Sequence, residues 1–322
     1  MSARANVTIR RSGPPDEPAV LELLSSSLGW RADDRHRQLL AWKHEENPFG
    51  RSPGWVATVD GHVVGYRTFL RWELVIDGEV VPAVRAVDTA THPDHRGKGV
   101  FGALTEHAVA AVRDEGVALV FNTPNDQSRP GYLKMGWQPV RRLPVRAMPR
   151  SPVALVRMAA ARTSADKWSL PASVGRAACG YEAWEAAAAL APADSGLRTH
   201  VSPAYLEWRY GFAPLHYRIV AGSDPGDGML IVRVRRRGQA TEVAVCEELV
   251  PDRDPRVTRR LLRRALTGSR ADYAVRLGDH LPRAGCISLP ARGPMLVCRD
   301  LSSRNIPPPS AWHLGLGDIE FF

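Results

Sequence analysis

The sequence predicts an α/β fold with a mixed β-sheet, and three observations support it. Two helical segments with apolar periodicity open the chain, hairpin-forming strands follow, and a strand–helix–strand unit comes next. Strands joined by a tight turn pair antiparallel, whereas strands joined through a helix pair parallel, so the sheet should contain both kinds of pair. The 322 residues exceed one typical domain, which favours two.

The two opening helices are expected over Pro18–Leu28 and Asp34–His44. The first repeats leucine and valine at helical spacing, and the second ends near a turn at Asn47–Gly50. Strand signals come next. They cover Trp55–Val59, Val63–Trp72, Glu73–Ile76, Val80–Ala83 and Val84–Thr91.

A hairpin and a helical crossover complete the first half. Asp77-Gly78 is a strong hairpin signal, because both residues tolerate positive φ. A helix is expected over Gly99–Glu115, with Gly116 as its C-cap. A compact buried strand over Val117–Asn122 then returns to the sheet.

The second half repeats part of this pattern. Leu40-Ala41-Trp42-Lys43 is echoed by Leu206-Glu207-Trp208-Arg209, and strands, a helix and a further strand follow again. We infer a weak internal duplication, with coincidence between two α/β stretches as the alternative. The expected division is a first domain over residues 1–149, an alanine-rich helical connector over 150–199 and a degenerate second copy over 200–322.

Composition sets the broad class of the protein. No apolar run is long enough to span a membrane and the opening residues contain no secretory signal, so a cytoplasmic protein without membrane insertion is expected. The four cysteines are scattered, and the pair His92 and His95 lies in a loop without further ligands, so no metal site is expected. The net charge of +9 reflects an arginine-rich composition or attraction of an anionic ligand.

A glycine-rich turn separates the strand that ends at Thr91 from the following helix. Gly97 and Gly99 permit positive φ and close approach of a ligand to the backbone. The free N–H groups of the turn and of the first helical turn, with Arg96 and Lys98 beside them, favour an anion such as a pyrophosphate. The spacing is neither that of a P-loop nor that of the dinucleotide fingerprint.

Two motifs in this region resemble those of the GNAT acyltransferases. Arg96-Gly97-Lys98-Gly99-Val100-Phe101 is similar to the R-x-x-G-x-G/A loop that holds the pyrophosphate of acyl-CoA, with Phe101 where glycine or alanine is usual. Asn122 and then Tyr132-Leu133-Lys134-Met135-Gly136-Trp137 are similar to the family's ending, in which Tyr-x-x-x-Gly-Phe follows a strand and an asparagine. The resemblance covers about residues 5–145.

The resemblance implies a GNAT fold in tandem with a degenerate C-terminal repeat. It implies that residues 1–149 form the catalytic domain and that acetyl-CoA or a longer acyl-CoA is the co-substrate, with no metal. The turn at Val250–Val257 contains no glycine, so no CoA site is expected in the second half. The implied cofactor-binding residues are Thr89, Ala90, Thr91, Arg96, Gly97, Lys98, Gly99, Val100, Phe101, Gly102, Asn122, Asn125 and Ser128.

The family also implies roles in the chemistry. Tyr132 is the implied acid for the leaving thiolate, with a core tyrosine as the alternative. A backbone N–H in Thr89–Thr91 is the implied donor to the thioester oxygen. Asn125 is equally well explained as a turn residue.

The general base is left open between several groups. Asp88 lies on the strand that usually carries a GNAT carboxylate, and Glu45 and Glu46 lie where the acceptor site is usually walled; a chain of water molecules is a further alternative. The apolar, aromatic C-terminal tail adds Phe322 or Asp318, because some GNATs with an extra domain return their terminal carboxylate to the active site.

The expected activity is transfer of an acyl group, acetyl by default, from acyl-CoA to a primary amine of a small molecule or peptide. The alternative is a non-catalytic module that binds acyl-CoA or binds RNA through Arg233, Arg235, Arg236 and Arg237. That run lacks interleaved aromatic residues and its alternate side chains point to opposite faces, so nucleic acid is not the favoured partner. The acceptor amine and whether the chain forms a homo-oligomer stay open.

Overall fold

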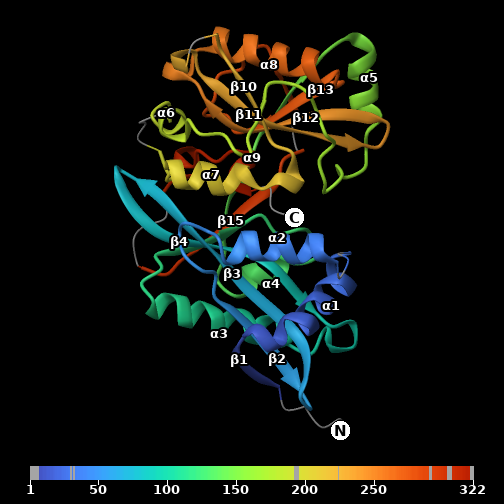
Figure 1. Cartoon of the computed structure of the whole chain (residues 1–322). Coiled ribbons are helices and arrows are strands. Elements are labelled where there is room, and N and C mark those ends of the chain that lie inside the picture. Colours follow the sequence, from blue (N-terminus) through green and yellow to red (C-terminus); the bar gives the residue numbers. More distant parts are fainter. Residues whose placement is uncertain are drawn as a thin grey trace. The chain divides into compact units, whose positions relative to one another are not determined.

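The computed structural model describes residues 7–29, 31, 33–191, 196–223, 225–289, 292–302 and 307–319. The chain folds into two compact units, each built around its own sheet (Figure 1). The first unit comprises residues 1–74, 80–140 and 296–306, and the second comprises residues 75–79, 141–295 and 307–322. No helix in the described part of the chain is long and apolar enough to cross a membrane.

The first unit has the predicted order of two helices, antiparallel strands and a helical crossover. Its sheet has the strand order β1-β2-β3-β4-β5-β15-β6. Its elements are the helices α1 (Glu17–Leu28), α2 (Asp34–His44), α3 (Val100–Asp114) and α4 (Arg129–Lys134), and the strands β1 (Thr8–Arg11), β2 (Gly54–Val59), β3 (His62–Ile76), β4 (Glu79–Thr91), β5 (Leu119–Asn122), β6 (Gln138–Arg142) and β15 (Met295–Asp300).

Local signals explain the boundaries of these elements. Asp33 caps α2, accepting a hydrogen bond from the backbone N–H of His36. The hairpin predicted at Asp77-Gly78 is confirmed, with φ values of 51° and 84°, and each arm is one long strand where the sequence predicted two. Gly116, at φ 85°, ends the crossover helix as expected.

The second unit has the sheet order β14-β7-β13-β12-β11-β10-β8. Its apolar core lies between this sheet and α8. The elements are the helices α5 (Pro152–Ala160), α6 (Trp184–Ala188), α7 (Pro203–Gly211), α8 (Pro255–Ser269) and α9 (Leu316–Ile319), and the strands β7 (Val145–Pro149), β8 (Arg176–Ala177), β10 (Arg218–Ala221), β11 (Met229–Arg237), β12 (Ala240–Leu249), β13 (Tyr273–Leu277) and β14 (Ile287–Leu289), with β9 (Arg198–Thr199) beside α7 in sequence.

The two sheets confirm the tandem fold and reveal an exchange of strands. Each sheet contains two neighbouring strands that are a parallel pair joined by a long helix: β4 and β5 through α3, and β12 and β13 through α8. In each sheet the strand beside this pair comes from the other half of the chain. β15 pairs with β5, and β7 pairs with β13. The units therefore depart from the expected division at residues 149 and 200.

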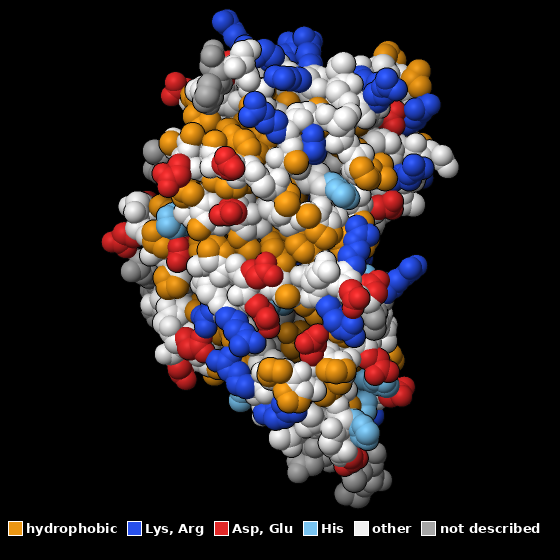
Figure 2. Space-filling view, viewed as in Figure 1, with side chains coloured by type: hydrophobic (Ala, Val, Ile, Leu, Met, Phe, Trp, Pro, Cys, Tyr) orange, Lys and Arg blue, Asp and Glu red, His pale blue; other side chains and the backbone are white. Residues whose placement is uncertain are grey.

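Basic side chains are unevenly distributed over the second unit. Figure 2 shows Lys and Arg gathered where α8 lies in Figure 1. That helix buries Leu261, Leu262 and Leu266, so its arginines are left on the outer side. The solvent face of this amphipathic helix thus carries the exposed residues Arg256, Arg259, Arg260, Arg263 and Arg264.

Opposite faces of the first sheet carry different helices. A Cβ added to Gly65 of β3 would lie 2.7 Å from Val100 and 2.8 Å from Leu104, both on α3. The next residue, Tyr66, lines a cavity together with His44 of α2. Because neighbouring strand residues point to opposite faces, α3 and α2 cover opposite faces of the sheet.

We expect Gly65→Ala to destabilise the protein by about 1–3 kcal/mol, because the methyl group would overlap two buried side chains of α3. Gly102→Ala, in the same helix, is the matched control: nothing lies within 4 Å of its added Cβ, and alanine favours a helix by about 0.5–1 kcal/mol over glycine. Urea unfolding of both variants measures the difference, and equal midpoints would contradict the close packing inferred at Gly65.

Candidate functional site

The first site feature is a wedge where β4 and β5 separate. The two strands pair in parallel from Ala83↔Leu119 to Arg85↔Phe121, although β4 continues to Thr91. Asp88 interrupts β4 with a φ of 42°, a left-handed conformation that is costly for a residue other than glycine. Past this bend, backbone groups of β4 have no partner strand in β5 and are available to a ligand.

The glycine turn lies directly beyond the wedge. Gly97 and Gly99 have φ values of 73° and 84°, so the turn needs glycine for its backbone conformation. Gly99 is the N-cap of α3 and provides no side-chain cap, which leaves the first N–H groups of the helix for an outside acceptor. Arg96 and Lys98 are exposed beside them. The geometry suits a phosphate-bearing ligand.

Phe101 does not fill the phosphate cradle. Its ring packs edge-to-face on Tyr132, with ring centroids 5.3 Å apart. A Cβ on Gly131 would lie 2.9 Å from the Phe101 ring. The large residue in the loop motif is therefore accommodated by glycine in α4, away from the backbone N–H groups of the turn. Val100 is buried under Gly65, and Gly102 faces open space.

Tyr132 is held by a residue that the motifs did not indicate. The Arg67 side chain, fully buried on β3, donates to the Tyr132 hydroxyl at 2.9 Å and to Thr105 Oγ1 at 2.7 Å. Because the guanidinium can only donate, the tyrosine oxygen is the acceptor and its own proton stays available for another group. The structure thus presents Tyr132 as a hydrogen-bond donor beside the first turn of α3.

The asparagines after β5 have different surroundings. Asn122 is buried, and its side-chain oxygen has no hydrogen-bond partner among the described residues. A buried acceptor of this kind is costly unless a ligand or water satisfies it. Asn125 instead accepts from the backbone N–H and hydroxyl of Ser128, both at 2.9 Å, which is a turn role. Cofactor binding by Asn125 and Ser128 stays a prediction.

Asp88 is engaged by two residues at the end of α2. Its Oδ2 lies 2.7 Å from Lys43 Nζ and 2.8 Å from His44 Nε2. Burial opposes ionisation, but these two neighbours outweigh it and lower the pKa of Asp88 to about 2. A carboxylate of that pKa is a poor acceptor for an ammonium proton, so Asp88 is better suited to orienting His44 than to acting as the base itself.

His44 has the properties of a proton acceptor. Burial lowers its pKa below the usual value despite the attraction of Asp88, so the ring is neutral at pH 7. If Nε2 carries the proton toward Asp88, Nδ1 is the basic nitrogen, and Nδ1 has no hydrogen-bond partner among the described residues. A carboxylate–imidazole pair of this kind orients the ring and stabilises its charged form. The sequence analysis did not single out His44.

His44 also opens onto a cavity of about 430 Å³ in the first unit. Tyr66, Asp16, Ser52, Arg71 and Glu45 line it with other residues of α1, α2 and the neighbouring strands. Glu45 is paired with Arg51 at 3.1 Å, whereas Glu46 is exposed and does not line the cavity. Of the two glutamates predicted to bind substrate, the structure brings only Glu45 to this cavity.

The C-terminal candidates are Phe322 and Asp318. Phe322 is outside the described residues. Asp318, on α9, accepts hydrogen bonds from Thr199 Oγ1 and from the backbone N–H of Gly315, both at 2.5 Å and both in the second unit. These two contacts lie within its own unit, and a role of Asp318 in the chemistry stays a prediction.

The metal and RNA alternatives gain no support. The described residues contain no group of three or more His, Cys, Asp or Glu side chains suited to a metal ion. In the arginine run, Arg235 and Arg237 both pair with Glu242, and Arg233 donates to the carbonyl of Lys167 at 2.5 Å. Three of these four arginines are therefore used within the second unit.

The first unit is similar to a known family of acetyltransferases. Residues 8–140 match the family model of the acetyltransferase (GNAT) domain. No curated protein matches the chain. Crystal structures with the same fold include a protein of unknown function from Enterococcus faecalis V583, described as a probable N-acyltransferase (13% identity, 92% of this chain and 73% of that chain, TM-score 0.68). Another is a GCN5-related N-acetyltransferase from Anabaena variabilis (13% identity, 92% of this chain and 73% of that chain, TM-score 0.63). A third is Eis1 from Mycobacterium abscessus (15% identity, 92% of this chain and 74% of that chain, TM-score 0.57).

We expect Lys43→Met to destabilise the protein by about 3–5 kcal/mol, because it leaves Asp88 buried with a weaker partner. The double variant Lys43→Met/Asp88→Asn should lose less stability than Lys43→Met and Asp88→Asn lose when their single effects are added, because it also removes the unpaired buried charge. Lys134→Met, at an exposed site, is the control and should change stability little. Urea unfolding of the unaltered protein, the two single variants, the double variant and the control measures these effects, and strict additivity would contradict the coupling.

Acid should weaken the same contact. The folded pKa of Asp88, about 2, lies below the unfolded value of about 3.9, so its contribution is complete above pH 4 and is lost as the pH falls toward 2. The lowered pKa of His44 acts in the same direction below its unfolded value of about 6.5. Unfolding free energies from pH 7 to 2 should therefore fall less steeply in Asp88→Asn than in the unaltered protein.

Proposed function

We propose that this protein, whose residues 8–140 match the model of the GNAT acetyltransferase domain, transfers an acyl group, acetyl by default, from acyl-CoA to a primary amine. The observation that carries this proposal is the wedge: β4 and β5 part beyond Arg85, beside an uncapped helix N-terminus with a glycine turn. A thioester can reach the backbone of Thr89–Thr91 while its pyrophosphate lies on Gly97–Gly102.

The residues that would hold acyl-CoA fit its chemistry. Positive charge from Arg96 and Lys98 and the N–H groups of the α3 start suit the pyrophosphate. The orphaned oxygen of Asn122 is an acceptor for an amide N–H of the pantetheine arm. Bound acyl-CoA supplies the activated carbonyl carbon and a thiolate leaving group.

Two proton transfers complete the reaction that we propose. His44 Nδ1 takes the proton that the attacking amine must lose, directly or through one water, and Asp88 stabilises the resulting imidazolium. The amine nitrogen forms a bond to the carbonyl carbon as the carbon–sulfur bond breaks. Tyr132 gives its proton to the departing sulfur, and solvent restores both groups. Because α2 and α3 cover opposite faces of the sheet, the acceptor would enter from the cavity beside His44 and the donor from the side of Tyr132.

We expect Tyr132→Phe to lower kcat by about 10²–10⁴-fold, which is the usual contribution of a positioned acid. The measurement is release of CoA thiol from acetyl-CoA in the presence of a library of amines. Tyr181→Phe, in the second unit, is the control for the substitution itself. Full activity of Tyr132→Phe would show that this hydroxyl is not the acid.

We expect His44→Gln to lower kcat by a similar factor and to remove the acidic limb of the pH–rate profile. That limb should lie below about pH 6.5 in the unaltered enzyme, because burial lowers the pKa of His44. His62→Gln, at an exposed position of β3, should keep both the rate and the limb. A His44→Gln enzyme that is slow but keeps the limb would limit His44 to a structural role.

The same purified protein can be used to distinguish a non-catalytic acyl-CoA-binding module from an enzyme. Calorimetry would detect binding of acetyl-CoA to the protein. Tight binding together with no thiol release from any amine would favour an acyl-CoA-binding module over an enzyme.

A further inference from the structure

The second unit does not repeat the cofactor site of the first. The parallel pairing of β12 and β13 ends three residues before Glu247, as that of β4 and β5 ends three residues before Asp88. Tyr210, at the place of His44 in the repeat, donates to Glu247 at 2.8 Å. The Asp254 side chain caps α8 by accepting a backbone N–H at 2.7 Å, so this helix start is a poor place for a pyrophosphate.

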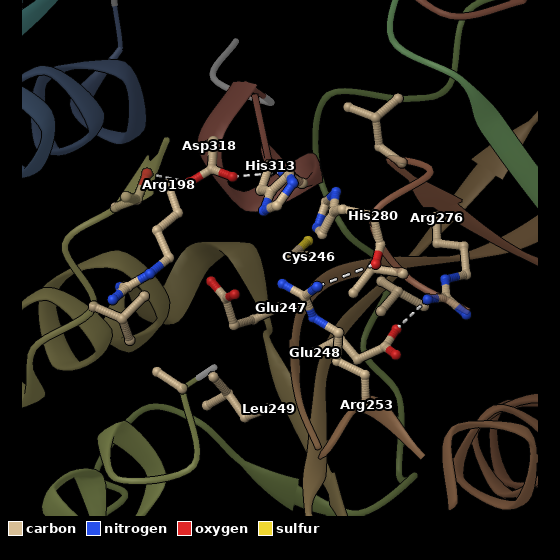
Figure 3. Close-up of a pocket in the computed structure, with 17 residues that line it drawn as sticks. Arg198, Cys246, Glu247, Glu248, Leu249, Arg253, Arg276, His280, His313 and Asp318 are labelled. Atoms are coloured by element: carbon tan, nitrogen blue, oxygen red, sulfur yellow. Dashed lines mark hydrogen bonds and ion pairs between the residues drawn. The ribbon is translucent and has the colours of Figure 1, made fainter. Parts of the chain in front are cut away.

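The cavity beside β12 and β13 already holds acceptors for its arginines (Figure 3). Arg276 pairs with Glu248 at 2.7 Å, and Arg253 donates to the carbonyl of His280 at 3.3 Å. The Asp318 carboxylate lines the same cavity. Because positive and negative groups occur there together, this cavity does not call for an added ion.

A groove between the end of β7 and α8 is different, because its lining carries charge of one sign. Its volume is about 280 Å³. Arg150, which follows β7, lines it together with Arg259 and Arg263 of α8. We call these three residues the groove arginines. The other lining residues are uncharged, namely Met148, Pro149, Leu266, Thr267 and Gly285.

The groove arginines form no ion pair within the described parts of the chain. Two carboxylates near this part of the unit are used by other cations. Asp272, whose carbonyl accepts from the backbone N–H of Arg150 at 2.8 Å, pairs its carboxylate with Arg157 at 3.1 Å. Asp227 lies 3.6 Å from Arg260. The groove thus presents three guanidinium groups that lack an ionic partner among the described residues.

The sequence of α8 offers them no compensation either. The helix contains no Asp or Glu, and its arginines recur every three or four residues along one face, at Arg256, Arg259, Arg260, Arg263 and Arg264. Like charges at this spacing repel one another and destabilise a helix. A bound anion would relieve the repulsion.

The packing of Arg259 directs it into the groove. A Cβ added to Gly285 would lie 3.2 Å from Arg259 Nε and 3.4 Å from Met148 Cε. The Arg259 side chain therefore crosses Gly285 on the side of β7, and Arg150 follows Met148 by two residues. Arg263 lies one turn further along α8, on the same face as Arg259. The three side chains therefore meet at one place.

A phosphate group matches this lining best. Guanidinium groups bind phosphate oxygens through paired hydrogen bonds. A phosphomonoester carries a charge of about −1.5 to −2 at pH 7 and three acceptor oxygens, so it can engage several arginines at once. One enclosed water needs about 10–15 Å³, so the groove has room for a phosphate and part of the molecule that carries it. The described lining has no aromatic side chain on which a base could stack, which disfavours a nucleic acid.

We propose that this groove binds the phosphate group of a phosphomonoester through Arg150, Arg259 and Arg263. The phosphate belongs to a soluble metabolite or to a lipid headgroup. The lipid source is included because Arg150 directly precedes α5, on which Val153 and Val156 are 63% and 68% exposed. Binding here is separate from the acyl transfer proposed for the first unit.

The test uses the full chain at constant ionic strength and glycerol phosphate as the soluble probe, observed by ³¹P NMR. The probe signal should broaden saturably as protein is added. Glutamine at each of the groove arginines should weaken binding by about tenfold, because each change removes one charged donor from an exposed site. Arg256→Gln removes the same charge from the same helix outside the groove, and it should change the affinity little.

Vesicles distinguish the two sources of the phosphate. Sedimentation of the protein with vesicles of phosphatidylcholine and phosphatidic acid, but not with phosphatidylcholine alone, would support a lipid headgroup if the groove variants lose it. Binding of glycerol phosphate without sedimentation would support a soluble phosphomonoester.

Three results would overturn the proposal. The first is no saturable binding of either probe, and the second is an equal loss of binding in Arg256→Gln and in the groove variants. The third is tighter binding of a single-stranded RNA oligonucleotide than of glycerol phosphate, with the same dependence on the groove arginines, because it would assign the groove to a nucleic-acid backbone.

Discussion

The buried contact between Lys43 and Asp88 is the constraint on which the first unit depends. Asp88 adopts a left-handed conformation within β4, and a bend of that kind persists only where the surroundings fix it. The 2.7 Å contact with Lys43 supplies this restraint by tying the strand to the end of α2.

The same contact decides the chemistry that the site can perform. A lone buried carboxylate would be protonated or would serve as a base, but Lys43 keeps Asp88 ionised and unreactive. Its charge is instead directed at His44, which lines the cavity beside α2. In the mechanism that we propose, the role of the base therefore passes from Asp88 on the strand to His44 on the helix.

The second unit shows how one scaffold can hold different chemistry at the same place. Its wedge has Glu247 where the first has Asp88, Tyr210 where the first has His44, and a capped helix instead of a glycine turn. The exchange of β7 and β15 means that each sheet is completed by the other half of the chain. Because neither sheet has all of its strands from one half, the two halves must fold together to be complete.

The sequence by itself determined the local structure and indicated the glycine turn as the candidate cofactor site. The span of α2, the hairpin at Asp77-Gly78 and the turn before α3 follow from capping, positive-φ residues and periodicity, which act over a few neighbours. The tertiary structure alone decided the strand exchange, the support of Tyr132 by Arg67, and the pairing of His44 with Asp88. These contacts join residues 44 to 65 positions apart, or strands from opposite halves, and no local pattern encodes which buried charges will meet.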